Sequence, residues 1–116
     1  MKLSKIVEHL NLQVLSGYDN LDVEIKRGYA SDLLSDVLAN SSFGDLWITM
    51  QIHPNIVAAA FARDLAGVIL VNSRKPEPET LEKAVKEAIP IMVTDMPAFE
   101  LIGKLYALGI NGAKDA

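Results

Sequence analysis

Four short polar stretches hold the side chains of this sequence that could recognise or transform a small molecule. Each stretch follows a predicted strand and precedes a pattern typical of a helix. Together they offer hydroxyl, carboxylate, amide, imidazole and guanidinium groups, which suit the binding of a phosphate or carboxylate. The expected ligand-binding residues are Ser31 and Asp32, then Gln51, His53 and Asn55, then Asn72, Ser73 and Arg74, and finally Thr94 and Asp95.

Catalysis is the weaker hypothesis for these residues. A serine or threonine nucleophile needs a base and a group that orients the base, and the only nearby imidazole, His53, has no evident orienting partner. His53 directly precedes Pro54, a position typical of a turn or cap residue. Asp32 and Asp95 stand where a carboxylate complements a helix dipole. We therefore expect no catalytic residues, and a kinase or phosphatase acting through His53 and Asp95 remains the third hypothesis.

Several other kinds of site are excluded by residue type. The sequence has no cysteine, which removes disulfides, thiolate catalysis and cysteine-based metal sites. His9 and His53 lie in separate elements without metal-ligand spacing, and no GxxxxGK[ST] or GxGxxG motif occurs. We expect neither a metal nor a cofactor. A net charge of -4 argues against a nucleic-acid partner, although the pairs Lys26–Arg27 and Arg74–Lys75 are each large enough to bind one anion.

The elements that position these residues follow from apolar patterns. The central unit is a strand over 46–50, which reads as covered on both faces, and a helix over 56–62, apolar all round and so predicted to be buried. The next unit predicts a strand over 68–71 and a helix over 78–88, supported by two i,i+4 pairs, Glu79 with Lys83 and Glu82 with Lys86.

The third unit predicts a strand over 89–93 and a helix from about residue 98 to Gly109 as its C-cap. Thr94 and Asp95 are predicted to cap this helix, and Pro97 to lie in its first turn.

The N-terminal part predicts a helix over 3–10, a strand over 13–16 and, from apolar–polar alternation over 21–27, a half-exposed strand near the sheet edge. Ser31 is predicted to cap a helix to about residue 39. Its apolar stripe comprises Leu33, Leu34, Val37 and Leu38.

Three successive strand–helix units imply right-handed crossovers and a parallel sheet with helices on both faces. The predicted fold is α/β, a single three-layer αβα domain with a mainly parallel sheet of about five strands. The domain is predicted over residues 1–110, with a flexible tail over 111–116. No apolar run reaches the roughly 18 residues of a membrane span, and the first ten residues are charged, so we predict a soluble cytoplasmic protein.

Taken together, residues 28–60, 66–72 and 81–105 resemble the DRTGG domain family, and the similarity extends over about residues 3–108. The family resembles the N-terminal domain of HPr kinase/phosphorylase. It occurs as a regulatory segment of phosphotransacetylases and of CBS-domain pyrophosphatases. The places of its naming motif correspond to 51–55 and 72–74, where this chain carries other residues. The resemblance implies a tendency to dimerise and, as in the pyrophosphatases, a nearby nucleotide-sensing role.

Two functional hypotheses lead. The first is a non-enzymatic regulatory module that binds a small anionic ligand, such as a nucleotide, at the carboxyl ends of the strands and works as a homodimer or beside a partner enzyme. The alternative is a pure protein–protein interaction and dimerisation domain without a metabolite ligand. The 50% hydrophobic content and the apolar residues on more than one side of the last helix favour this alternative.

Overall fold

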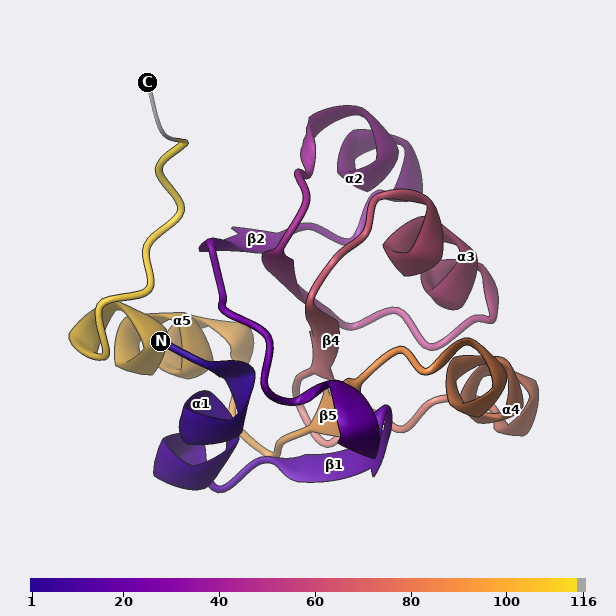
Figure 1. Ribbon diagram of the computed structural model, residues 1–116, viewed down its shortest axis with the longest axis horizontal. Helices are drawn as coiled ribbons and strands as arrows, with labels where there is room; N and C mark the ends of the chain where they lie inside the picture. The colour runs from indigo at the N-terminus through magenta and orange to yellow at the C-terminus, as the bar shows by residue number, and fades with distance from the viewer. Residues whose placement is uncertain (115–116) are drawn as a thin grey trace.

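A computed structural model describes residues 1–114 as one sheet between two layers of helices (Figure 1). The helices are α1 (Leu3–Leu10), α2 (Leu34–Asn40), α3 (Asn55–Ala62), α4 (Pro78–Glu87) and α5 (Ala98–Ala107), with a short 3-10 helix η1 (Tyr18–Asn20). The strands are β1 (Gln13–Ser16), β2 (Arg27–Ala30), β3 (Asp45–Thr49), β4 (Gly67–Leu70) and β5 (Ile91–Val93). They form a five-stranded sheet in the order β1-β5-β4-β3-β2.

The sheet is mainly parallel, as predicted. Strands β2, β3, β4 and β5 are parallel, and β1 pairs antiparallel with β5. All five residues of β3 are buried because the strand has neighbours on both sides and helices on both faces. Its Trp47, predicted to lie in the core or an interface, is fully buried, and its Nε1 donates a hydrogen bond to the Ser31 carbonyl at 2.9 Å.

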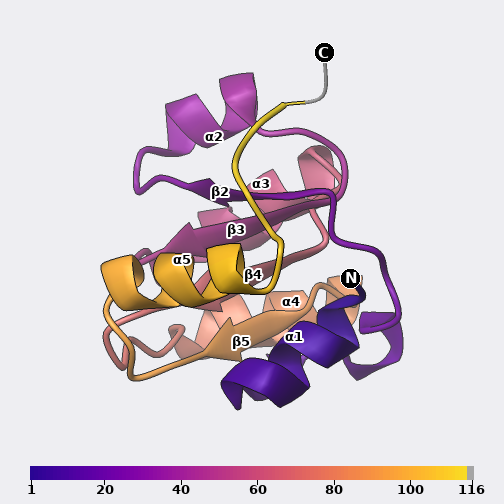
Figure 2. The same ribbon diagram turned by 90° about the vertical axis from the view of Figure 1, so that its left-hand side faces the viewer.

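The helices divide into two layers. Figure 2 shows α1 and α5 on one face of the sheet and α2, α3 and α4 behind it. Two buried clusters lie between these layers and the sheet, one containing Leu3, Leu101 and Leu105, the other Val37 and Ala84. The single αβα domain predicted from the strand–helix units is therefore confirmed.

The strand predicted over 21–27 is wrong in its position. Pairing with β3 begins only at Arg27, and residues 21–26 contain a single bridge, from Lys2 to Glu24. The segment is held instead by the start of α1, since Leu3 N donates to the Val23 carbonyl at 2.9 Å. Alternating burial therefore arises here without a ladder, while β2 does occupy the predicted edge.

Two apolar helix patterns overestimate burial. In the apolar stripe predicted for α2, Val37 is buried, whereas Leu33, just before the helix, and Leu38 are 64% and 41% exposed because no further element covers them. In α3, Phe61 is 54% exposed, so the helix predicted to be buried all round is buried on one side.

Two predicted caps are also wrong. Helix α2 begins at Leu34, beyond Ser31, whose Oγ instead accepts a hydrogen bond from Leu33 N at 3.1 Å. Pro97 is the N-cap of α5, which has no side-chain cap bond, because Asp95 is engaged elsewhere. The predicted Gly109 C-cap is consistent with its φ of +94°, just after the helix ends.

The chain after α5 crosses β2 (Figure 2). Gly28 N donates to the Asn111 carbonyl at 2.9 Å, and Arg27 Nη1 donates to the Gly112 carbonyl at 3.4 Å. The flexible tail over 111–116 stays a prediction, and its residues 115–116 lie outside the described part of the chain. Over residues 1–114, no helix has the length and apolar character that crossing a membrane requires.

Candidate functional site

The four polar stretches lie along one rim of the sheet. Because β2, β3, β4 and β5 are parallel, their carboxyl ends meet at the same edge, where the loops lead into the helices (Figure 2). Ser31 and Asp32 follow β2, and Gln51 follows β3. Asn72, Ser73 and Arg74 follow β4, while Thr94 and Asp95 follow β5. The topology thus supplies the common rim on which a ligand site in this fold class would depend.

Asp32 joins the ends of β2 and β3. Its Oδ1 accepts hydrogen bonds from Thr49 Oγ1 at 2.7 Å and from Met50 N at 2.8 Å. Its carbonyl oxygen accepts a further bond from Gln51 Nε2 at 2.5 Å. The Asp32 carboxylate therefore holds two strand ends together. Asp32 Oδ1 thus already accepts two hydrogen bonds from the protein itself.

The turn after β4 has an unusual backbone. Asn72 and Ser73 have φ values of +57° and +59°, and Arg74 N donates to the Val71 carbonyl at 3.1 Å. Positive φ at both central residues is typical of a type I′ turn, which side chains other than glycine adopt at a cost. Asparagine tolerates this conformation better than serine does. The conformation places Arg74 directly after a strained turn.

Hydrogen bonds fasten this turn to the loop after β5. Asn72 N donates to the Met96 carbonyl at 2.9 Å, and Ser73 N donates to the Thr94 carbonyl at 3.0 Å. The Ser73 hydroxyl also donates to Asp95 Oδ1 at 2.8 Å. Since backbone and side chain both contribute, the two loops form one unit.

A cavity of about 420 Å³ lies beside this unit. Ser73, Arg74, Thr94 and Asp95 line it, and Lys75 adds a second cation. The opposite wall comes from the α1–β1 region, whose polar residues are Asn11 and Gln13. Hydroxyls, two amides and two cations, beside the one carboxylate of Asp95, in a cavity of this size can bind a phosphate group together with a larger organic part.

His53 and Asn55 lie in a different hollow. His53 Nδ1 accepts a hydrogen bond from Asn55 N at 3.0 Å, which satisfies a backbone donor at the start of α3. Both residues line a groove of about 780 Å³ between α3 and α4, which also contains Lys83. The structure thus brings together the residues after β4 and β5, and separates His53 and Asn55 from them.

The two halves of the rim meet at one weak contact. Asn72 Nδ2 lies 3.0 Å from Met50 Sδ, and this contact connects the turn after β4 to the end of β3. Gln51 Oε1 is buried and has no hydrogen-bond partner within the described residues. A ligand that extended from the cavity toward β3 would meet these groups. The predicted set of site residues as a whole remains a prediction.

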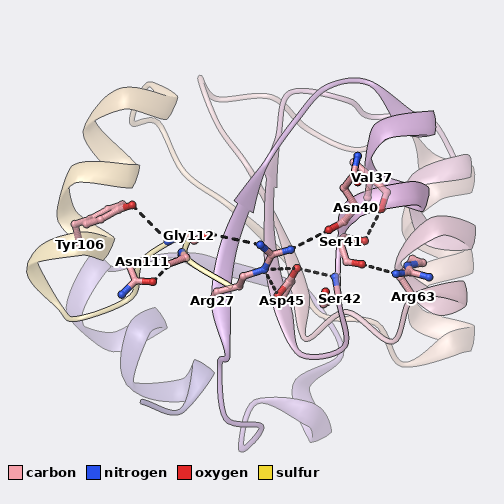
Figure 3. A network of polar contacts seen from close by, with 11 residues as sticks. Arg27, Val37, Asn40, Ser41, Ser42, Asp45, Arg63, Tyr106, Asn111 and Gly112 are labelled. Carbon is pink, nitrogen blue, oxygen red and sulfur yellow. Dashed lines mark hydrogen bonds and ion pairs between the residues drawn. The ribbon is translucent and has the colours of Figure 1, made fainter. Parts of the chain in front are cut away.

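The amino ends of β2 and β3 hold a buried ion pair that the sequence did not reveal (Figure 3). Arg27 Nε lies 3.0 Å from both carboxylate oxygens of Asp45, and Arg27 Nη2 donates to the Asn40 carbonyl at 2.9 Å. The expectation that Lys26 and Arg27 could bind an anion as a pair is wrong for Arg27, since its guanidinium faces a carboxylate of the protein. No signal in the sequence indicated this pair, because the strand was predicted over 21–27 and so ended at Arg27, where β2 in fact begins.

Tyr29 connects the middle of β2 to α2. Its hydroxyl donates a 2.7 Å hydrogen bond to Asp36 Oδ2, and Asn40 Nδ2 donates to Asp36 Oδ1 at 2.9 Å. Two hydrogen bonds lower the pKa of Asp36, the one from Tyr29 more than the one from Asn40. The bond between Tyr29 and Asp36 also raises the pKa of Tyr29. Within residues 1–114, no group of three or more acidic, histidine or cysteine side chains could hold a metal ion.

Comparisons with known proteins find similarity among solved structures. No model of a known protein family matches the sequence, and no curated protein matches it. Among solved structures, the chain is similar to the CBS and DRTGG domains of the regulatory region of a Clostridium perfringens pyrophosphatase, complexed with the activator diadenosine tetraphosphate. The TM-score is 0.73 at 17% sequence identity, over 95% of this chain and 47% of that one.

This similarity confirms the predicted fold. At 17% identity the likeness concerns the arrangement of the backbone, and it supports the DRTGG-like domain that the sequence pattern indicated. The chain spans about half the length of the pyrophosphatase regulatory region.

Proposed function

We propose that this chain is a non-enzymatic regulatory module that binds a small anionic ligand, such as a nucleotide, at the carboxyl ends of its strands. We further propose that it acts in the cytoplasm as a homodimer or beside a partner enzyme. The observation that carries the proposal is the cavity of about 420 Å³ in which Arg74 and Lys75 adjoin the hydroxyls of Ser73 and Thr94. A phosphate beside those groups gains charge-assisted hydrogen bonds from the cations.

The strained turn supports this assignment. Each residue with positive φ costs on the order of 1–3 kcal/mol relative to a relaxed backbone, and such strain gathers at ligand sites. Asn72 and Ser73 are two such residues in succession, and both backbone amides bond to the loop after β5. The turn is therefore rigid, so less entropy is lost when Arg74 meets a ligand.

The structural neighbour supports the ligand class. That protein's regulatory region was solved with diadenosine tetraphosphate as its activator. A nucleotide combines phosphates, for which Arg74 and Lys75 are suited, with a flat base and a sugar that need the remaining volume of the cavity.

The arrangement of side chains favours binding over catalysis. The Ser73 hydroxyl donates directly to Asp95, and His53, which could have served as a base, caps α3 beside another groove. Neither the hydroxyl nor the imidazole has the second partner that a nucleophile–base pair requires.

A protein–protein interaction domain without a metabolite is the second candidate. The observation that favours it is the number of large apolar side chains that are exposed to solvent. Phe99 is 88% exposed, Phe43 68% and Leu33 64%. Single exposed apolar residues are ordinary, and these three lie on separate elements, but a partner that covered any one of them would remove a large apolar side chain from water.

Thermal unfolding with ligands tests the first proposal. Diadenosine tetraphosphate, ATP, ADP and inorganic phosphate would each be titrated, and a ligand at 100 times its dissociation constant adds about 2.7 kcal/mol to the free energy of unfolding. We expect a nucleotide to raise the melting temperature of the native protein. If none of the four compounds shifts it, the proposal is overturned.

Paired variants locate the site. Arg74→Ala and Lys75→Ala are expected to weaken nucleotide binding about tenfold each, since each removes a charge-assisted contact. Lys83→Ala, an exposed lysine in the groove between α3 and α4, is the matched control and should leave affinity unchanged. The reverse result would move the ligand to the groove that contains His53.

A further inference from the structure

Phe43 occupies the loop between α2 and β3, at the end of the sheet opposite the ligand rim. Its side chain is 68% exposed and lies at the border of two hollows, of about 400 Å³ and about 360 Å³. A large aromatic ring open to water between two hollows is unfavourable for an isolated domain. The groups around it indicate what would cover the ring.

The larger hollow is acidic. Its apolar floor includes Ala60, Ile89 and Pro90, and a second aromatic ring, that of Phe61, is 54% exposed at its wall. The exposed carboxylates that line it are those of Asp19, Asp22, Asp64 and Glu87. No lysine, arginine or histidine of residues 1–114 lines this hollow. Of the four carboxylates, Asp22 alone forms an ion pair in the described chain, with Lys2 at 3.8 Å.

The smaller hollow is basic. Lys26 and Lys114 line it, together with Arg27, which is bonded to Asp45. Lys26 forms no ion pair with any described residue. Its stem packs over Gly44, where an added Cβ would lie 2.5 Å from Lys26 Cγ. Because Gly44, whose φ is +81°, has no side chain, the stem of Lys26 has room to lie there, next to Phe43.

We propose that this surface, named the Phe43 face and consisting of the two hollows and Phe43 between them, is the interface between two copies of the chain. Around a two-fold axis near Phe43, the acidic hollow of each copy meets Lys26 and Lys114 of the other. Such isologous contacts need one patch that complements itself, and charges of opposite sign on either side of an apolar centre provide it. The inference concerns only the dimer in the proposed function and does not depend on a ligand.

The presence of both signs favours a second copy over a different partner. A basic partner would pair with the carboxylates and leave Lys26 unpaired, while an acidic partner would do the opposite. A second copy pairs both sets at once and covers Phe43 with an identical ring. A standard interface needs about 800 Å² per partner, roughly an eighth of the 6252 Å² accessible surface.

Analytical ultracentrifugation of the native protein at tens of micromolar tests the interface. We expect a dimer, and we expect Phe43→Ser to weaken association at least about tenfold, because a central aromatic residue dominates such contacts. Phe99→Ser is the matched control, since Phe99 is even more exposed but lies on α5. A native monomer, or dissociation by Phe99→Ser with Phe43→Ser still dimeric, overturns the proposal.

Charge reversal gives a sharper test that depends on the two-fold geometry. Lys26→Glu alone, and the double variant Asp19→Lys with Glu87→Lys, should each be monomeric because like charges then face each other. Mixed together, the two variants should form a heterodimer, because the reversed hollow of each variant then faces a hollow of opposite charge on the other. All three positions are exposed, so folding should be retained, which circular dichroism checks. A mixture that stays monomeric overturns the interface.

The outcomes separate this inference from the ligand proposal. A monomeric protein that still shows the nucleotide shift, lost in Arg74→Ala, would refute the Phe43 face and leave the ligand site standing. A dimer that dissociates as predicted but responds to no nucleotide would do the opposite.

Discussion

The two ends of the sheet use arginine in opposite ways. At the amino ends, Arg27 is 7% exposed and bonds to Asp45 and to the carbonyls of Asn40 and Gly112 (Figure 3). At the carboxyl ends, Arg74 is exposed and beside a cavity, and within residues 1–114 only its backbone amide forms a hydrogen bond. One guanidinium is satisfied by the fold, while the other remains available to a ligand.

This difference indicates how the domain separates stability from binding. The Arg27 bonds connect β2 to β3, to the end of α2 and to the chain after α5, so they join parts of the sequence as far as 85 residues apart. Arg74, at the carboxyl end, joins no such segments through its side chain among the described residues. Substitution of Arg27 should therefore change unfolding, and substitution of Arg74 should change binding.

The largest effect is expected from Arg27→Ala. Removing one partner of a buried ion pair leaves the Asp45 carboxylate, which is fully buried, without its counter-charge. This typically costs about 3–5 kcal/mol. Urea unfolding followed by circular dichroism should show this loss. Arg74→Ala, the same change at the other end, should stay within about 0.5 kcal/mol of the native protein. Equal effects of the two changes would refute the comparison.

An intermediate effect is expected at Asp32, which joins the rim residues of β2 and β3. Asp32→Ala leaves the hydroxyl of Thr49, a residue 2% exposed, without its acceptor and should cost about 1–2 kcal/mol in urea unfolding. Asp32→Asn keeps an oxygen at the same position and should cost less than half as much. If the two variants are equally destabilised, the charge of Asp32 matters more than its hydrogen bonds.

Local pattern predicted the repeating part of this fold because strands and helices are encoded over neighbouring residues. The all-buried β3 and the ion pair of Glu79 with Lys83, 3.7 Å apart, both followed from short-range spacing. The second predicted pair, Glu82 with Lys86, forms no ion pair among the described residues. The exposed Leu33 and Leu38 show the limit of that reasoning. An apolar stripe indicates which face could be buried, while burial depends on whether another element arrives to cover it.

The candidate site was predictable only in part for the same reason. Parallel strands place Ser73 and Thr94 at one rim, as the repeated units implied. The wall formed by Asn11 and Gln13 depends on β1 pairing antiparallel with β5, across nearly 80 residues, which no local signal encodes. The pair of Arg27 and Asp45 depends likewise on register between two strands.

A smaller effect is expected from relieving the strained turn. Ser73→Gly removes the cost of a side chain at φ +59° but also loses the bond to Asp95, so the free energy of unfolding should rise by about 0.5 kcal/mol. Ser73→Ala loses the bond and keeps the strain, so its free energy of unfolding should be lower than that of the native protein by about 1 kcal/mol. Both should bind nucleotide more weakly. A glycine variant less stable than the alanine variant would contradict the strain.

The smallest effect, and one that depends on pH, is expected at Tyr29, between the two ends. Asp36 has a lowered pKa, so its contribution to the free energy of unfolding is present above the ordinary pKa of 3.8. That contribution is lost as pH falls through the lower pKa of the folded state. Tyr29 has a raised pKa, so its contribution to the free energy of unfolding is present below the ordinary pKa of 10.0. That contribution is lost as pH rises through the higher pKa of the folded state.

Tyr29→Phe removes the shared hydrogen bond and leaves the ring over which Arg27 lies, 5.2 Å from the centroid. The stability difference between native and variant protein should therefore be constant near neutral pH and shrink at both extremes. Urea unfolding from pH 3 to 10.5 checks this. A difference that persists undiminished at pH 3 would assign the effect of Tyr29 to packing against the amino end.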